Sequence, residues 1–401
     1  MTDYRGTLQL KRGREKPVEN RHPWIFSGAV EAVHGDPEPG DLVAVVDSRD
    51  RWLATAYYNA RSQIRARILS WEADDIVDEA WWYARLQAAI GRRLALQLEP
   101  DTTAYRLVNA EADFLPGLVV DRYADYLVLQ ALTMGIERRK AMLASALSEL
   151  TGAAGIVERS DVDVREKEGL PATRGLLAGE QPPPSVEIRE HGLRFLVNLM
   201  EGHKTGLYLD QRENRALLGQ PRFVSGKELL NVFAYTGGFA VLAAAAGAGP
   251  ITNIDSSVAV LEQAERNMAQ NGFDRPGDEY LAGDAFKVLR HYRDTGRQFD
   301  VIILDPPKFA HSQRDVQPAC RGYKDLNWLA FRLLRPGGLL ATFSCSGLVD
   351  ADLFQKVVFG AAVDAGRDAQ ILFRLGQAPD HPILLTFPES AYLKGLLLRV
   401  V

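Results

Sequence analysis

The sequence predicts an α/β protein in which residues 185–401 form a doubly wound sheet of seven strands, preceded by a small β-barrel at residues 1–72 and a central α+β module at residues 73–184. Three observations predict this division. Apolar, strand-like runs alternate with helical periodicity through most of the C-terminal half, which is typical of a sheet with helices on both faces. Short strands punctuated by Pro and Gly near the N-terminus are typical of a barrel. The stretch between these two parts contains enough strands and helices for a module of its own.

The N-terminal segment carries a cluster of positive charge beside its first strand. Residues 1–22 hold six Arg and Lys side chains against three acidic ones, and Lys11, Arg12 and Arg14 stand together in the turn after that strand. Such a cluster is either a solvated face or a patch that contacts RNA phosphates, and composition does not decide between the two. The strands expected in this module lie at residues 7–10, 24–33, 42–46, 52–58 and 64–69.

A connecting helix and a small sheet are predicted for the central module. Apolar residues recur every three to five positions over residues 77–98, as they do on one face of a helix. Strand-like runs then fill residues 106–132 and 155–158, with a helical pattern at residues 136–150 between them. The Pro- and Gly-rich run at residues 175–184 is expected to be the exit from this module and its boundary with the next domain.

The C-terminal half begins its alternation with a strand, a glycine turn and a helix. An apolar run from residue 229 leads into Gly237 and Gly238, and a helical pattern follows. Glycine lets the backbone N–H groups of such a turn approach a ligand closely. Asp255 ends the next predicted strand, where folds of this kind bind the hydroxyls of a ribose. The turn lacks the G-x-G-x-x-G pattern of nicotinamide and flavin dinucleotide sites, so we expect a different ligand with an adenosine half.

Two further predicted strands end in acidic residues. Asp284 follows one of them and Asp305 follows the other, and Pro306 and Pro307 then fix a rigid loop. Because the carboxyl ends of parallel strands meet at one edge of a sheet, we expect these carboxylates and the glycine turn to share a site.

Composition limits the class of protein. The 401 residues carry a formal net charge of −5, so an anionic partner has to meet local basic patches rather than the field of the whole molecule. Two cysteines, Cys320 and Cys345, are too few for a disulfide framework and favour a reducing cytoplasm. No apolar run is long enough to span a bilayer, so no membrane partner is expected. His203, His311 and His381 show no metal-ligand spacing, so no metal is expected.

Several runs of residues resemble known RNA-modifying enzymes. Residues 10–14 and 22–29 are similar to the start of a PUA domain, a small RNA-binding barrel. Four later runs together resemble the class I S-adenosylmethionine-dependent methyltransferases that carry an N-terminal PUA domain, act on large-subunit (23S) ribosomal RNA and make 5-methylcytosine. They lie at residues 204–215, 231–239, 305–309 and 343–347. The resemblance implies a Rossmann-like class I methyltransferase domain, S-adenosyl-L-methionine as cofactor, ribosomal RNA as partner and RNA contact by the basic turn.

The resemblance also implies roles around the cofactor. Asp255 would bind the ribose hydroxyls and Asp284 the adenine amine, with Ala285 and Phe286 beside the adenine ring. From its position alone, Asp210 would instead cap a helix. The cofactor-binding set that the resemblance implies is Lys204, Tyr208, Asp210, Asn231, Phe233, Tyr235, Thr236, Gly237, Asp255, Ser256, Asp284, Ala285, Phe286 and Asp305.

Cys345 is the candidate nucleophile. Carbon 5 of cytosine is a poor nucleophile, so a thiolate has to add to carbon 6 before a methyl group can be taken up. Cys345 follows an apolar strand, where α/β sheets present catalytic groups, although an inert buried cysteine is the alternative on position alone. Asp305 is expected to bond the amino group or ring nitrogen of the cytosine, and Lys308 is the candidate positive charge for the thiolate.

Two other functions stay open. A strand-end Asp-Pro-Pro loop also serves methylation of a guanine or adenine nitrogen, and Cys345 would then be dispensable. A non-catalytic RNA-binding assembly factor would show a damaged cofactor pocket, whereas Asp255 and Asp284 are intact. Lys308 stands where another branch of cytosine-5 RNA enzymes has a cysteine that assists product release, so the base of that step is open and Cys320 is expected to be structural. The target nucleotide and the oligomeric state also stay open, a homodimer being one possibility.

Overall fold

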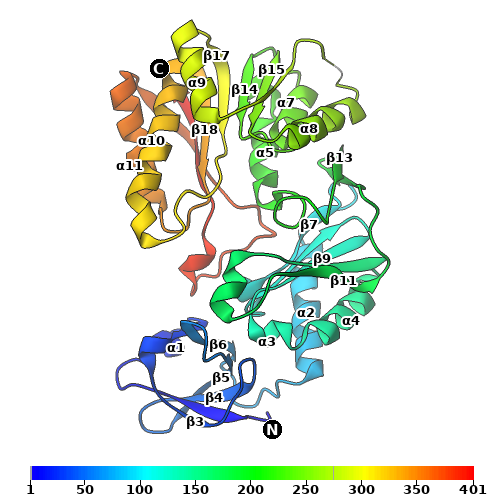
Figure 1. Cartoon of the computed structure of the whole chain (residues 1–401), viewed down its shortest axis with the longest axis vertical. Helices are drawn as coiled ribbons and strands as arrows, with labels where there is room; N and C mark the ends of the chain where they lie inside the picture. Colours follow the sequence, from blue (N-terminus) through cyan, green and yellow to red (C-terminus); the bar gives the residue numbers. More distant parts are fainter. Residues whose placement is uncertain (1, 274) are drawn as a thin grey trace. The chain divides into compact units, whose positions relative to one another are not determined.

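The chain folds into two compact units, each of which is described by itself (Figure 1). The computed structural model describes residues 2–273 and 275–401. Unit 1 contains the N-terminal and central modules, and unit 2 contains the large sheet. Unit 1 takes the residues up to 188 together with 197–209 and 379–390, and unit 2 takes residues 189–196, 210–378 and 391–401.

Six strands build the N-terminal module around an apolar core. Its elements are β1 (Gly6–Leu10), α1 (Lys16–Glu19), β2 (Trp24–Phe26), β3 (Val30–Gly35), β4 (Leu42–Val46), β5 (Trp52–Tyr58) and β6 (Ile64–Ser70). The strand order is β2-β6-β5-β4-β1-β3, and Leu8, Val43 and Ala56 are fully buried in the core. Residues 24–33, predicted as one strand, are two. A 3-10 turn at Ser27–Ala29 separates β2, which pairs with β6, from β3, which pairs with β1.

A five-stranded sheet with helices forms the central module. Its elements are α2 (Glu79–Leu94), β7 (Ala104–Asn109), β8 (Leu118–Tyr123), β9 (Tyr126–Ala131), α3 (Met134–Glu137), α4 (Lys140–Thr151), β10 (Gly155–Ser160) and β11 (Thr173–Gly179), with the strand order β11-β10-β9-β8-β7. Strand β11 covers the first part of the Pro- and Gly-rich run at residues 175–184, where it pairs antiparallel with β10. Glycine permits a close backbone approach at this strand pair, since a Cβ on Gly155 would lie 1.9 Å from the Glu180 carbonyl oxygen.

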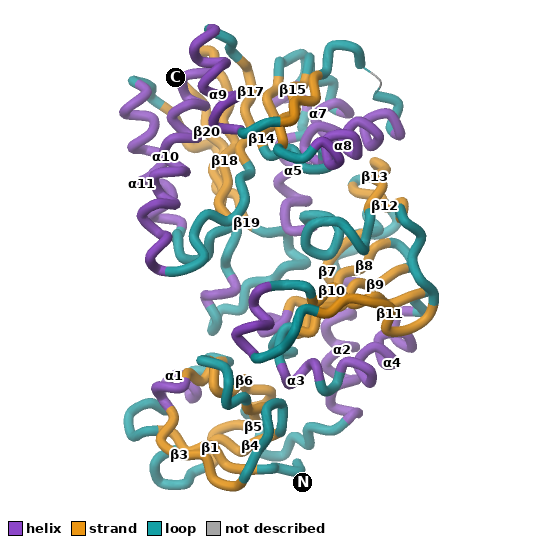
Figure 2. Tube along the Cα trace, in the orientation of Figure 1, coloured by secondary structure: helices purple, strands orange, loops and turns teal. Residues whose placement is uncertain are grey.

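Unit 2 is built on a seven-stranded sheet, as the sequence predicts. Its elements follow a hairpin of β12 (Val186–Glu190) and β13 (Leu193–Val197), and Figure 2 shows their alternation. They are α5 (Arg212–Leu218), α6 (Pro221–Val224), β14 (Leu229–Val232), α7 (Gly238–Ala245), β15 (Ile251–Asp255), α8 (Val258–Gln270), β16 (Glu279–Ala282), α9 (Ala285–Thr295), β17 (Phe299–Leu304), α10 (Val316–Leu333), β18 (Leu334–Ser344), α11 (Ala351–Ala365), β19 (Ala369–Gly376) and β20 (Lys394–Val400). The strand order is β16-β15-β14-β17-β18-β20-β19.

Helices cover both faces of this sheet. The strands from β16 to β18 are parallel, and β20 runs antiparallel to its two neighbours. Helices α9, α10 and α11 pack together in one group and α5, α7 and α8 in another, on opposite faces in Figure 1. Leu230, Ile302 and Leu340 on the central strands are fully buried, which explains why these strands read as continuous apolar runs.

Helix α10 begins at Val316, although the periodicity of the sequence predicts a helix only over residues 323–334. A capping box formed by Ser312 and Asp315 precedes it. Pro318 falls in its first turn, where a missing N–H group is tolerated. The earlier start places Cys320 on this helix.

Candidate functional site

Five neighbouring strands of unit 2 end at the same edge of the sheet, and a predicted site residue follows each one. Because β16, β15, β14, β17 and β18 are parallel and adjacent, their carboxyl ends form a row. Doubly wound sheets bind their ligands at this edge. In strand order, the residues at these ends are Asp284, Asp255, Phe233, Asp305 and Cys345.

The loop after β14 has an uncommon backbone conformation. Phe233 and Tyr235 have φ angles of 63° and 48°, in the left-handed region that residues with a Cβ rarely adopt. Between them, the N–H group of Ala234 donates to the Ile254 carbonyl oxygen at 2.9 Å. Strained residues of this kind persist only where the surroundings hold them, and they cluster at ligand-binding sites.

Gly237 fits this loop for two reasons. Its φ angle is 79°, and a Cβ at this position would lie 2.9 Å from the Cβ of Ala264 on α8. Also on α8, Asn267 donates from Nδ2 to the Thr236 carbonyl oxygen at 2.9 Å. The loop therefore lies directly on α8, with room for glycine alone at position 237.

Asp255 connects this loop to the next one. Its Oδ2 accepts from the Tyr235 N–H at 3.0 Å, and its Oδ1 accepts from the Ser257 N–H at 3.1 Å. The carboxylate is half-buried, and Ser256 beside it is exposed. Because each carboxylate oxygen can accept more than one hydrogen bond, Asp255 can hold the loop and still bind ribose hydroxyls.

Asp284 and its neighbours combine a carboxylate with apolar surface. Asp284 caps α9, accepting from the Lys287 N–H at 2.9 Å. Ala285 is buried, and Phe286 is half-buried against the core of unit 2. This combination suits the amine and the ring of an adenine.

Asn231 lies inside the sheet. Its Nδ2 donates to Asn253 Oδ1 at 3.0 Å across the β14–β15 pair, and both side chains are buried. Its own Oδ1 has no hydrogen-bond partner in the part of the chain that the structure describes. The structure therefore gives Asn231 a contact between strands, beside the predicted cofactor site.

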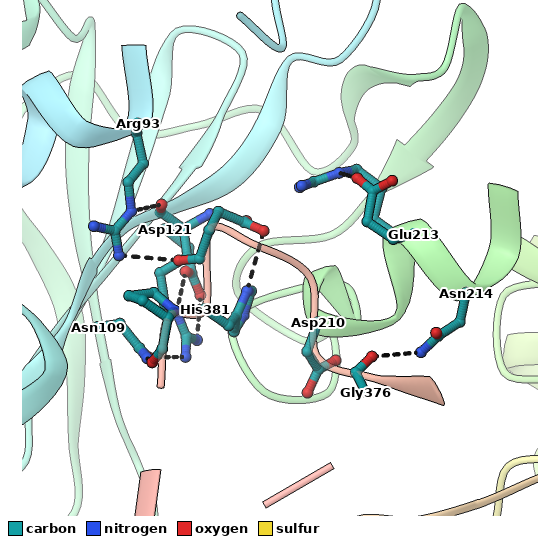
Figure 3. A network of polar contacts seen from close by, with 12 residues as sticks. Arg93, Asn109, Asp121, Asp210, Glu213, Asn214, Gly376 and His381 are labelled. Carbon is teal, nitrogen blue, oxygen red and sulfur yellow. Dashed lines mark hydrogen bonds and ion pairs between the residues drawn. The ribbon is translucent and has the colours of Figure 1, made fainter. Parts of the chain in front are cut away.

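Asp305 is held by two amide side chains whose roles the sequence did not reveal. Gln211 donates from Nε2 to Asp305 Oδ1 at 3.0 Å. Asn214 donates to Gln211 Oε1 at 2.6 Å and to the Gly376 carbonyl oxygen at 2.8 Å, the second contact being drawn in Figure 3. Both amides are buried. The signal that could have found them is their spacing of three residues at the start of a helix, which places them on one face.

Cys345 lies against the loop that carries Asp305. Its Sγ is 4.0 Å from the Pro306 carbonyl oxygen, to which the thiol donates. Both Cys345 and Asp305 are half-buried, so each is reachable from solvent. The structure thus brings the three predicted catalytic residues to adjacent loops, with Lys308 on the same loop as Asp305.

Ser346 fastens these two loops to each other. Its buried Oγ accepts from the N–H groups of Phe309 at 3.2 Å and Ala310 at 3.3 Å. The same hydroxyl lies 2.9 Å from the Tyr323 hydroxyl on α10. The loop after β17 and the loop after β18 are therefore one hydrogen-bonded assembly.

Of two lysines near these loops, one is exposed and the other is buried. Lys308, the predicted source of positive charge, is exposed. Lys394 at the start of β20 is buried, and its Nζ donates to the carbonyl oxygens of Ser346 and Val349, each at 2.6 Å. Burial lowers the pKa of Lys394 to about 8, and the nearby Cys345 acts to raise it. The sequence did not reveal that Lys394 is buried, because a lysine as the first residue of an apolar strand is normally exposed to solvent.

Asp210 is connected to two later segments of unit 2. Its Oδ2 accepts from the Tyr392 hydroxyl at 2.7 Å, and its carbonyl oxygen accepts from the Ala378 N–H at 2.9 Å. The alternative that Asp210 caps a helix is wrong, because the N-cap of α5 is Gln211 and no side chain caps that helix.

Lys204 and Tyr208 belong to unit 1. The Nζ of Lys204 lies 4.4 Å from the centroid of the Tyr208 ring, and the Tyr208 hydroxyl lies 3.4 Å from His203 Nδ1. The structure thus brings these two predicted cofactor residues together with each other.

The three basic residues of the N-terminal module are exposed in the turn between β1 and α1. Lys11 donates to the Gly28 carbonyl oxygen at 3.3 Å, and Arg12 and Arg14 stand beside it in the turn. A pocket of about 220 Å³ adjoins Arg14. Its largely apolar lining is formed by Arg14, Pro17, Val18, His22, Trp24, Ile25, Phe26 and Ala29.

Asp380 and His381 lie in a buried polar network of unit 1, part of which Figure 3 shows. Asp380 Oδ2 accepts from the Arg106 N–H at 2.8 Å, and the Arg106 guanidinium donates twice to Asp121, at 2.7 and 3.0 Å. Burial acts to raise the pKa of Asp121, but Arg106 and His381 outweigh it and hold that pKa below its usual range. His381 is 2% exposed, so its side chain is packed inside the protein.

Residues 2–273 and 275–401 offer neither a metal site nor a membrane-spanning helix. No group of three or more His, Cys, Asp and Glu side chains there could hold a metal ion. Over the same residues, no helix combines the length and apolar character needed to cross a membrane.

Comparison with known proteins agrees with this architecture. Residues 8–71 match the model of a PUA-like domain, and residues 136–399 match that of an S-adenosylmethionine-dependent methyltransferase. The chain is 51% identical over 393 residues to the ribosomal RNA large subunit methyltransferase I of Shewanella amazonensis, covering 98% of this chain and 99% of the relative. It is 47% identical over 394 residues to the enzyme of that name from Erwinia tasmaniensis, with 98% and 99% covered.

The fold is also that of a solved structure. A protein described as a SAM-dependent methyltransferase from Streptococcus mutans superposes with a TM-score of 0.85 at 22% identity, covering 98% of this chain and 99% of that one. The predicted fold class and cofactor are thereby confirmed. On the matched domains and the full-length relatives, the chain belongs to the family of S-adenosylmethionine-dependent methyltransferases and carries a PUA-like domain at its N-terminus.

Proposed function

We propose that this protein transfers a methyl group from S-adenosyl-L-methionine to carbon 5 of a cytosine in large-subunit (23S) ribosomal RNA, in the cytoplasm. The relatives that match over the full length are named for methylation of large-subunit ribosomal RNA, which supports the substrate class. The observation that carries the carbon-5 chemistry is the position of Cys345, whose thiol lies against the Asp305 loop at the ligand-binding edge of the sheet.

A thiol at this place supplies what carbon-5 methylation needs. The Cys345 thiolate forms a bond to carbon 6 of the cytosine, and the displaced electron pair makes carbon 5 nucleophilic. S-adenosyl-L-methionine, when bound, supplies the electrophilic methyl group. A base then removes the proton from carbon 5, the bond between sulfur and carbon 6 breaks, and the thiolate leaves. Asp305, fixed by Gln211, is positioned to accept from the amino group or protonated ring nitrogen while charge builds in the ring.

The residues at the strand ends fit this cofactor. Close packing of Gly237 against α8 fixes the loop after β14 at the strand ends, and Asp255 and Asp284 supply two carboxylates at the ends of adjacent strands. We assign the ribose hydroxyls to Asp255 and the adenine amine to Asp284, with Ala285 and Phe286 against the adenine ring. The other predicted cofactor residues, Lys204, Tyr208, Asp210, Asn231, Phe233, Tyr235, Thr236, Ser256 and Asp305, are kept as proposals.

We assign the three functional modules to residues 1–72, 73–184 and 185–401, with RNA contact by the first and catalysis by the last. The exposed cations Lys11, Arg12 and Arg14 suit phosphate groups. The largely apolar pocket beside them has the aromatic lining on which an unstacked RNA base can pack. Together they provide one polar and one apolar contact for a single-stranded segment.

Nucleoside analysis by mass spectrometry tests the proposed reaction. Ribosomal RNA from cells that lack the gene is incubated with S-adenosyl-L-methionine and with wild type, Cys345→Ala or Cys320→Ala. We expect 5-methylcytosine with wild type and Cys320→Ala, and none with Cys345→Ala, whose affinity for the cofactor should stay near that of wild type because the thiol takes part only in the chemistry. If Cys345→Ala still methylates the RNA substantially, and the new methyl group is found on a purine or on a nitrogen atom, the result would support nitrogen methylation organised by Asp305 instead.

A further inference from the structure

Lys394 fastens the loop that carries Cys345. It is the first residue of β20 and pairs in register with Ser344, the last residue of β18. Its Nζ donates to the carbonyl oxygens of Ser346 and Val349, each at 2.6 Å, so one ammonium group holds both ends of the turn that follows Cys345. Hydrogen bonds from a charged donor are among the stronger ones in proteins, and the side chain is only 8% exposed.

The charge of Lys394 lies beside Cys345 in the fold, because Lys394 pairs with Ser344 on one side of that cysteine and its Nζ bonds the Ser346 carbonyl oxygen on the other. Cys345 and Asp350 act to raise the pKa of Lys394, whereas Lys308 acts to lower it. Asp350 and Lys308 are both exposed, so solvent and salt screen their charges. A buried ammonium group close to a half-buried thiol is screened far less.

Tyr323 and Asp305, which also lie near the Cys345 loop, carry no positive charge. Tyr323, on α10, is neutral near pH 7 as an ordinary tyrosine is, and burial raises the pKa of its hydroxyl further. Asp305 stands one residue before Pro306, whose carbonyl oxygen contacts the thiol, and a negative charge there disfavours a thiolate. A nucleophilic thiol in these surroundings therefore needs a cation.

We propose that Lys394 is a positioning residue for the reaction, which fixes the Cys345 loop and supplies the positive charge that stabilises the Cys345 thiolate. This inference rests on the proposed function, in which Cys345 is the nucleophile. The pKa of Lys394, about 8, leaves the ammonium form dominant at pH 7, and the proton that Cys345 releases passes to solvent. Because the two groups interact, each titration depends on the other.

The pH dependence of Cys345 alkylation tests this proposal. The full-length protein is treated with iodoacetamide over a range of pH, and the rate at each cysteine is obtained from the peptides by mass spectrometry. Removing the charge in Lys394→Met and Lys394→Gln should shift the midpoint for Cys345 upward by about one pH unit. Lys308→Met should shift it much less. Cys320 is the internal control, and its profile, set by burial that raises the pKa of its thiol, should not move.

A purely structural role gives a different result. If the Lys394 variants change the Cys345 rate by the same factor at every pH and leave the midpoint in place, the electrostatic role is wrong. Lys394→Arg keeps the charge, so its midpoint should lie near that of wild type. If Lys394→Met fails to fold, the alkylation midpoints of Lys394→Arg and Lys394→Gln are compared instead. Equal midpoints in these two variants would contradict the proposal. Alkylation needs neither RNA nor methyl transfer, so a failure of the proposed function would show separately, as methylation by Cys345→Ala.

Discussion

At the scale of single residues, the sequence predicted some features of the loop after β14 and missed others. Gly237 stands out in the sequence, and the structure gives it both a φ angle of 79° and a close contact with α8. The left-handed conformations of Phe233 and Tyr235 could not be predicted, because aromatic side chains carry no sequence signal for them. They depend on partners brought in by the fold, such as the Asp255 carboxylate that binds the Tyr235 N–H.

Gly237→Ala should destabilise the protein more than a matched glycine substitution. Gly296, at the end of α9, has a similar φ angle of 73° but open space around its Cβ position. Gly296→Ala should lower the free energy of unfolding by about 1–2 kcal/mol, from the backbone alone. Gly237→Ala adds the clash with Ala264 and should also weaken cofactor binding. Denaturant unfolding and calorimetry measure both effects, and equal losses with unchanged cofactor affinity would contradict this account of the loop.

At the scale of elements, periodicity predicted the order of unit 2 well and the ends of some elements poorly. The apolar parallel strands were visible because both of their faces are buried. The start of α10 was missed, because its capping box lies in a polar stretch and Pro318 interrupts the pattern that follows. In strand β11, Gly179 permits a close backbone approach at the start of β10, which the sequence pattern does not show. The reason for a glycine in a strand can be inferred only once the partner strand is known.

The turn between β1 and α1 carries the prediction for RNA binding. Replacing Lys11, Arg12 and Arg14 together by Ala should weaken RNA binding and reduce the slope of log K against log salt by about 0.7 for each phosphate that the protein no longer neutralises. A control variant with Arg5→Ala and Arg49→Ala removes exposed charge from the same module outside the turn. When RNA binding is measured by fluorescence anisotropy over a salt series, only the triple variant should show the reduced slope. An unchanged slope would assign the turn to solvation, and cofactor binding should be the same in all three proteins.

At the scale of the whole molecule, the sequence predicted which candidate residues lie at the strand ends but not which side chains hold them. Asp255, Asp284, Asp305 and Cys345 could be found because each follows an apolar strand. The side chains that support the site come from distant parts of the chain. Gln211 precedes its partner Asp305 by 94 positions and Lys394 follows Ser346 by 48, so no local pattern reveals either contact.

The most direct test of the central claim is whether a covalent bond forms between Cys345 and the RNA. Substrate RNA that carries 5-fluorocytosine is incubated with the full-length protein and S-adenosyl-L-methionine, and the mixture is separated by denaturing electrophoresis. Fluorine cannot leave carbon 5 as a proton does, so the thiolate cannot be released, and wild type should be trapped in an adduct that Cys345→Ala does not form. Peptide mass spectrometry should locate the attachment at Cys345. Absence of any adduct from wild type, with fluorinated RNA that the protein demonstrably binds, would contradict carbon-5 methylation through this cysteine.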